Sequence, residues 1–126
     1  MGTGYKANTS HHYSISENLK NIKENYAFSN GLFGSRGNSS RESTRHIESE
    51  NPIFTSKDFY DKLTKGAIGK NLPNGKGKVS KMKDGSIISY RPISSSDGSP
   101  AVDINIRKSN NSGGIKQQKI HFVKKG

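Results

Sequence analysis

AVDINIR, residues 101–107, decides the fold, because apolar and polar side chains alternate along it. Successive side chains of a β-strand point to opposite faces, so Val102, Ile104 and Ile106 share one face and the polar residues share the other. The same alternation occurs in the segments before and after this one. The sequence therefore predicts four strands, at Lys78–Met82, Ser86–Ile93, Ala101–Arg107 and Ile115–Val123.

Short polar segments separate the four predicted strands. Asp84-Gly85 is a hairpin signal, because both central positions of a type I′ turn need positive φ. Asp97-Gly98 lies in the next loop, and residues 109–114 form another segment rich in Gly, Asn and Ser. Strands joined by loops this short pair as an antiparallel meander.

The first half of the chain predicts helices. Ser14 or Ser16 caps a helix whose apolar face ends at Tyr26 and which stops near Gly31. Thr55 or Ser56 caps a second, shorter helix with Phe59, Tyr60 and Leu63 on its apolar face. Residues 31–51 carry few apolar anchors and predict a long, mobile connection. Helices followed by strands are typical of the α+β class, and we expect residues 1–51 to be a partly disordered linker and helix, and residues 52–126 the functional domain.

Composition and charge indicate the kind of partner. Only 28% of the residues are apolar, which is too few to bury a large core along the whole chain. The net charge is +11, and residues 56–126 hold fifteen basic and five acidic residues. A polyanion, nucleic acid or an acidic protein, is the expected partner, and a solubilising surface is the alternative. No apolar run is long enough for membrane insertion.

The polar face of the predicted sheet carries the candidate catalytic residues, which are Arg91, Asp103, Lys119 and His121. A histidine titrates near neutral pH and serves as general acid or base. Arg91 and Lys119 can hold a phosphate and neutralise charge in the transition state, and Asp103 can orient the histidine or act as its partner. RNA supplies its own nucleophile, the 2′-hydroxyl, so this chemistry needs no metal and no cofactor. Further candidate substrate-binding residues are Asn105, Lys76, Lys78, Ser94, Ser95 and Ser96.

Alternatives exist for each of these signals. A lone histidine in a lysine-rich strand is often a solvated surface residue, and His46, the competing histidine, lies in a charged segment that predicts a linker. Gly75-Lys76-Gly77-Lys78 lacks the spacing of a P-loop and predicts a turn with two phosphate-contacting lysines. With no cysteine, and with no His/Glu/Asp cluster at ligand spacing, the sequence predicts no metal site.

Residues 53–126 resemble the C-terminal toxin domains of LXG-type polymorphic toxins of Gram-positive bacteria. The likeness rests on three stretches, GKGKVSKMKDGSIISYRP (75–92), SSSDGSPAVDINI (94–106) and QKIHF (118–122). It implies one or two helices on a curved four-stranded antiparallel sheet, as in barnase, EndoU, colicin ribonucleases and RelE.

The resemblance also implies a function, a delivery route and a partner. The function is metal-independent cleavage of RNA, with His121, Arg91 and the Ser94–Asp97 loop at motif positions. The toxin is secreted by a type VII system, acts in the cytoplasm of target bacteria and is held inactive by a small acidic immunity protein. One departure from barnase is that we expect no glutamate in the strands to act as base.

Two alternative functions are a DNase toxin and a non-enzymatic basic module that binds nucleic acid. Single-strand binders stack bases on exposed aromatic side chains. The strand aromatics here, Tyr90 and Phe122, are predicted to lie on the core face, which favours catalysis.

Overall fold

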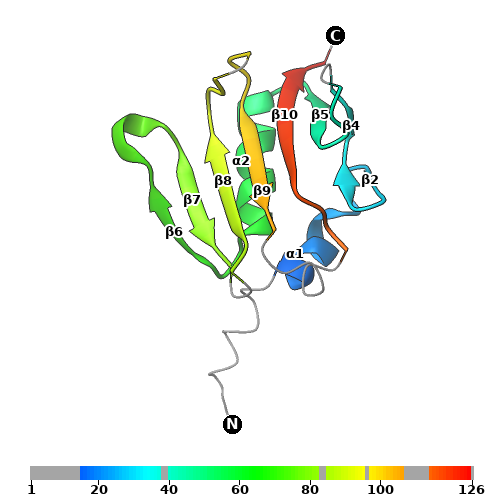
Figure 1. Cartoon of the computed structure of the whole chain (residues 1–126). Helices are drawn as coiled ribbons and strands as arrows, with labels where there is room; N and C mark the ends of the chain where they lie inside the picture. Colours follow the sequence, from blue (N-terminus) through cyan, green and yellow to red (C-terminus); the bar gives the residue numbers. More distant parts are fainter. Residues whose placement is uncertain (1–14, 38–39, 83–84, 96, 107–113, 126) are drawn as a thin grey trace.

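The computed structural model describes residues 15–37, 40–82, 85–95, 97–106 and 114–125 (Figure 1). Helices in these ranges are α1 (Ile15–Ile22) and α2 (Pro52–Leu63), with one 3-10 turn, η2 (Pro73–Gly75). The strands are β2 (Phe28–Ser29), β3 (Leu32–Phe33), β4 (Ser35–Arg36), β5 (Thr44–Ser49), β6 (Ile68–Asn71), β7 (Lys78–Lys81), β8 (Ile87–Arg91), β9 (Ala101–Asn105) and β10 (Gln118–Lys124). No helix in the described part of the chain is long and apolar enough to cross a membrane.

Seven of the described strands form one sheet, in the order β4-β5-β10-β9-β8-β7-β6. All neighbours in it are antiparallel except β5 and β10, which are parallel. The α+β class and the antiparallel β7–β10 meander are confirmed. The predicted four-stranded sheet is wrong, because β6 extends one edge and β5 with β4 extends the other.

One face of the sheet packs on the helices, and α2 lies behind β8, β9 and β10 in Figure 1. Phe59 of α2 is fully buried, with its ring 4.9 Å from that of Phe33 and 5.5 Å from that of Phe122, centroid to centroid. The predicted apolar residues of β8, β9 and β10 lie on this face, including Tyr90 and Phe122. The opposite face, which we call the open face, is the one predicted to carry chemistry.

The prediction that residues 31–51 form a mobile connection is wrong. β5 lies in this segment and pairs with β10 along six residues, from Thr44 opposite Lys119 to Ser49 opposite Lys124. The sheet therefore contains strands from both sides of the predicted boundary at residues 51 and 52. Apolar periodicity missed β5 because Ile47 is its one aliphatic side chain.

Residues 31–51 are anchored by two buried polar side chains, and not by apolar ones. The Arg45 guanidinium donates to the carbonyl oxygens of Phe33 (2.8 Å), Glu42 (2.9 Å) and Gly34 (3.0 Å). The Gln118 amide accepts from the Phe33 N–H and donates to the Gly31 carbonyl. Buried backbone groups need such partners, so these contacts order residues 31–34.

The ends of both helices differ from the prediction. α1 ends at Ile22, and Asn30 (φ 55°) with Gly31 (φ 82°) turns the β2–β3 hairpin, so Gly31 is not a helix stop. Two consecutive positive φ values are the type I′ signature. α2 begins at Pro52, where Asn51 caps it by accepting from the Phe54 N–H (3.2 Å), so Thr55 and Ser56 are not the cap.

Candidate active site on the open face

The two histidines in the described chain that lie on the sheet are direct neighbours. His46 of β5 stands opposite His121 of β10, and their ring centroids are 6.1 Å apart at 76°. Opposed residues share a face, so one row across the open face runs from Ser35 through both histidines to Ala101 and Arg91. The interpretation of His46 as a linker residue is wrong, because β5 places it beside His121.

The loop between β8 and β9 holds the His121 ring. Ser99 Oγ lies 3.0 Å from His121 Nδ1, and Asp97 Oδ1 lies 3.3 Å from the same nitrogen. Asp97 in turn accepts from the Ser94 hydroxyl and from both the backbone N–H and the hydroxyl of Ser99. These hydrogen bonds hold the pKa of Asp97 well below its usual range. The ring is thereby oriented through Nδ1, the nitrogen that Ser99 and Asp97 both contact.

His121 is only 5% exposed, and this burial lowers its pKa below the ordinary 6.5. Asp97 raises the pKa, while Lys119 and His46 lower it further. Burial outweighs the neighbouring carboxylate, so the neutral ring, which can accept a proton, is favoured at neutral pH.

His46 is half-buried, and glycines surround it. A Cβ on Gly34 (φ 64°) would lie 2.2 Å from the His46 carbonyl oxygen, and one on Gly37 would lie 3.0 Å from the ring. Both positions let the chain pass close to His46, and Gly34 also needs its left-handed conformation. The glycine-rich sequence of this segment therefore packs it against the site.

The other predicted catalytic residues lie on the same face. Lys119 and Asp103 are direct neighbours across β10 and β9, and Lys119 shares its face of β10 with His121. Arg91 is exposed, two strands from His121 in the same row. Asn105 is exposed on this face but lies one step beyond Asp103 along β9, away from the histidine row. The register thus gathers Arg91, Asp103, Lys119 and His121, and it is Asp97 that lies against the histidine ring.

The predicted substrate-binding residues divide into three groups. Ser94 is buried and donates its hydroxyl to Asp97 (2.9 Å), Ser95 is exposed, and Ser96 lies outside the described residues. Lys76 is exposed in the turn between β6 and β7. Lys78 stands opposite Tyr90, which places it on the helix-packed face and not with His121. The structure therefore does not bring either lysine to the histidine pair.

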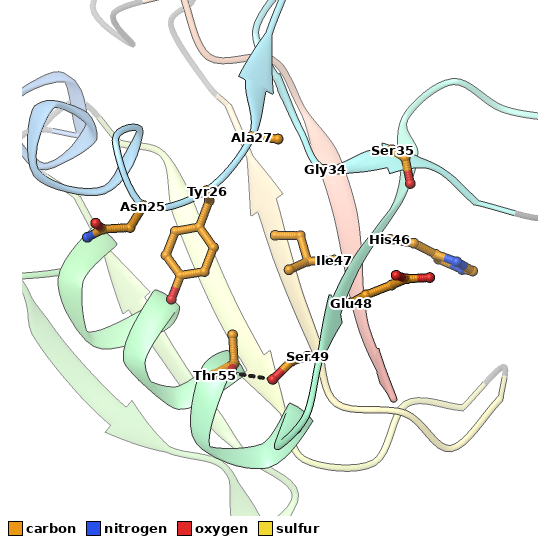
Figure 2. Close-up of a pocket in the computed structure, with 10 residues that line it drawn as sticks. All are labelled: Asn25, Tyr26, Ala27, Gly34, Ser35, His46, Ile47, Glu48, Ser49 and Thr55. Atoms are coloured by element: carbon orange, nitrogen blue, oxygen red, sulfur yellow. Dashed lines mark hydrogen bonds between the residues drawn. The ribbon is translucent and has the colours of Figure 1, made fainter. Parts of the chain in front are cut away.

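The expectation that no glutamate lies in a strand is wrong, because Glu48 belongs to β5. It is exposed on the same face as His46 but stands opposite Val123, one step farther along the strand. His46 and Glu48 both line a cleft of about 560 Å³ beside β5, whose lining residues are drawn in Figure 2. Within the described residues, no group of three or more His, Asp or Glu side chains could hold a metal ion.

Comparison with protein families, curated proteins and solved structures finds no match.

Three features of the site were not predicted from the sequence, namely His46, Ser99 and the contact of Asp97 with the His121 ring. A local signal existed for the last two, because Asp97-Gly98-Ser99 can form an Asx turn, and Ser99 N–H does donate to Asp97 Oδ1 (3.0 Å). No local signal existed for His46, because its place depends on a parallel pairing over 75 residues of sequence.

Proposed function

We propose that the chain is a metal-independent endoribonuclease whose histidine pair is the general acid and base. The observation that carries this proposal is the 6.1 Å separation of the His46 and His121 rings on the open face. A histidine nitrogen reaches a reacting oxygen across about 3 Å, so two rings this close can serve two oxygens of one phosphate.

The roles are divided by the environment of His121, because burial lowers its pKa and favours the neutral ring that a base needs. Neutral His121 takes the proton of the 2′-hydroxyl, whose oxygen attacks phosphorus, and the bond from phosphorus to the 5′-oxygen breaks. Protonated His46 gives its proton to that leaving oxygen. The products are a 2′,3′-cyclic phosphate and a free 5′-hydroxyl. Lys119, next to His121 on the face, and Arg91 stabilise the charge that develops on the phosphate oxygens.

The charge of the open face supports a nucleic-acid substrate. The register places four basic side chains on this face, Lys70, Lys81, Arg91 and Lys119, against two acidic ones, Asp103 and Glu48. A basic face attracts the phosphate backbone and raises the rate of encounter. Tyr90 and Phe122 are buried on the other face, so they offer no stacking platform, which favours cleavage over simple binding.

The resemblance of residues 53–126 to LXG-type toxin tails supports the biological setting of this proposal. In that setting the chain is the toxin domain of a secreted protein with a barnase-like fold, delivered by type VII secretion into the cytoplasm of target bacteria. A small acidic immunity protein holds it inactive in the producer. Its acidic surface complements the basic open face.

A pH profile of RNA cleavage in EDTA tests the proposal. Cleavage persists in chelator, and the acidic limb of kcat/KM falls below pH 6.5, because His121 must be neutral and its pKa is lowered. Lys119→Met removes a positive charge that lowers this pKa, so the acidic limb moves to higher pH. Asp97→Asn removes a negative charge that raises the pKa of His121, so the acidic limb moves to lower pH. Loss of cleavage in EDTA, restored by Mg²⁺, contradicts the proposal, because the cleavage then depends on a metal.

A further inference from the structure

We propose that a second cleft, between the first turns of α2 and the strands β7 and β8, binds a small phosphate monoester with an apolar body. Its lining includes Ile53 and Lys57 of α2, Lys78 of β7 and Tyr90 of β8. The start of α2 and the turn between β6 and β7 lie at the same end of the sheet (Figure 1). The volume of this cleft, about 420 Å³, is in the range of sites for small organic ligands, roughly 300–1,000 Å³.

Tyr90 brings a buried hydroxyl without a partner to this cleft. The residue is 4% exposed, and within the described residues its hydroxyl is the one buried side-chain polar atom that has no hydrogen-bond partner. The neighbouring Tyr60 ring, 6.0 Å away between centroids, does have a partner, because its hydroxyl is hydrogen-bonded to Ser80. A buried polar group without a partner lowers stability. A ligand that accepts from the Tyr90 hydroxyl removes this cost.

Two lysines give the cleft its charge. Lys78 stands opposite Tyr90 in the pairing of β7 with β8, so both side chains lie on the helix-packed face. Lys57 follows Ile53 by four residues in α2, and residues four apart share one side of a helix. Within the described residues, neither lysine forms an ion pair and no acidic side chain lines the cleft. The cleft therefore attracts an anion.

The segment Gly75-Lys76-Gly77-Lys78 closes one side of the cleft. Gly75, Gly77 and Lys78 line it. A Cβ on Gly77 would clash with the Tyr90 carbonyl oxygen, and its φ of 137° also disfavours other residues, so glycine lets the segment lie against β8. The sequence predicted a turn with two phosphate-contacting lysines here, and the structure brings one of them, Lys78, into a cleft.

A phosphate monoester matches the donors of the cleft. It carries a charge of about −1.5 to −2 at neutral pH and three strong acceptor oxygens. The two lysines balance that charge, and together with the tyrosine hydroxyl they supply three donor groups. A carboxylate has only one charge and two oxygens. Ile53, Leu72 and Pro92 add apolar surface to the lining, which favours a monoester whose alcohol part is apolar.

Binding of phenyl phosphate to the wild-type chain, followed by NMR titration, tests the site. We expect it to bind about tenfold more tightly than inorganic phosphate, which lacks the ring, and than benzoate, which has one charge. Lys78→Gln weakens the binding by about tenfold. Lys76→Gln, the same change at an exposed residue outside the lining, leaves it unchanged. Equal binding of the three probes, or equal effects of the two changes, overturns the inference.

Tyr90→Phe and Tyr60→Phe form a matched pair that separates ligand binding from folding. Tyr90→Phe removes a hydroxyl without a partner, so stability to urea is kept or rises, while phenyl phosphate binds about fivefold or more weakly. Tyr60→Phe removes the hydrogen bond to Ser80, so stability falls, and binding is unchanged because Tyr60 lies outside the lining. A loss of stability in Tyr90→Phe, or unchanged binding by it, overturns the inference.

Two further results separate this site from the proposed catalytic site. Phenyl phosphate does not compete with RNA, because the histidine pair lies on the opposite face of the sheet. A 5′-phosphorylated DNA oligonucleotide does not displace phenyl phosphate, because a sugar follows its phosphate in place of an apolar group. Competition in either experiment overturns the inference and assigns the cleft to nucleic acid. Binding of phenyl phosphate by a wild-type chain that cleaves no RNA contradicts the proposed function and leaves this site.

Discussion

His121→Ala lowers kcat for RNA cleavage by about 10²–10⁴-fold, the usual contribution of a general acid or base. Removal of the ring leaves the 2′-hydroxyl without a base, while Lys119 and Arg91 still bind phosphate. KM therefore changes little, and the loss falls on kcat. Expression of the wild-type chain in a bacterial cytosol arrests growth, and His121→Ala relieves the arrest.

Two further variants control this result. Lys65→Ala, an exposed change just beyond α2, removes one positive charge and keeps the toxicity. His46→Ala causes a loss of kcat comparable to that of His121→Ala, and because His46 is half-buried it tests the pair even where the loss of buried His121 disturbs the fold. The double variant is no worse than either single one, because the pair acts as a unit. A folded His121→Ala protein with wild-type toxicity contradicts the catalytic role.

Arg45→Ala lowers the free energy of unfolding by about 2–4 kcal/mol, because hydrogen bonds to a charged group are worth ~1.5–3 kcal/mol each and do not add fully. The Arg45 side chain, 9% exposed, donates to the backbone carbonyls of Phe33 in β3, of Gly34 and of Glu42, and so holds β3 against β5. This is a large share of the ~5–15 kcal/mol that stabilises a small domain. Urea unfolding of the wild type and of Arg45→Ala measures this difference in the free energy of unfolding.

Arg36→Ala is the matched control for this change. Arg36 lies in the same segment but is exposed, and its guanidinium donates to the Ser40 carbonyl (2.7 Å) at the surface. We expect its loss to cost less than about 0.5 kcal/mol, as for most surface substitutions. Equal stability of the two variants contradicts the account of how residues 31–49 are ordered.

The parts of the fold that sequence predicted are those that carry apolar periodicity. Val102 and Ile104 indicated the faces of β9, and Ile120 with Phe122 indicated those of β10, so the position of His121 on the open face was predicted correctly. β6 was not predicted, because all four of its residues are exposed at the edge of the sheet. Edge strands bury little, so their sequences carry little pattern.

Only the part of the candidate site that comes from the C-terminal strands was predicted. Arg91, Asp103, Lys119 and His121 come from neighbouring strands of one meander, where local alternation determines the face. His46 comes from a parallel strand that buried Arg45 and Gln118 hold through hydrogen bonds. A strand held by polar side chains has the same composition as a linker. The sequence alone does not distinguish the two, because the burial of these side chains depends on partners far away in the sequence.

One measurement tests the central claim most directly, the cleavage of an RNA oligonucleotide with a single 2′-deoxy linkage in EDTA. We predict that the deoxy linkage stays intact, because it lacks the attacking hydroxyl. Neighbouring linkages are cut to 2′,3′-cyclic phosphate and 5′-hydroxyl ends. Cleavage of the deoxy linkage at the same rate, or products with a 5′-phosphate, would contradict acid–base catalysis by His46 and His121.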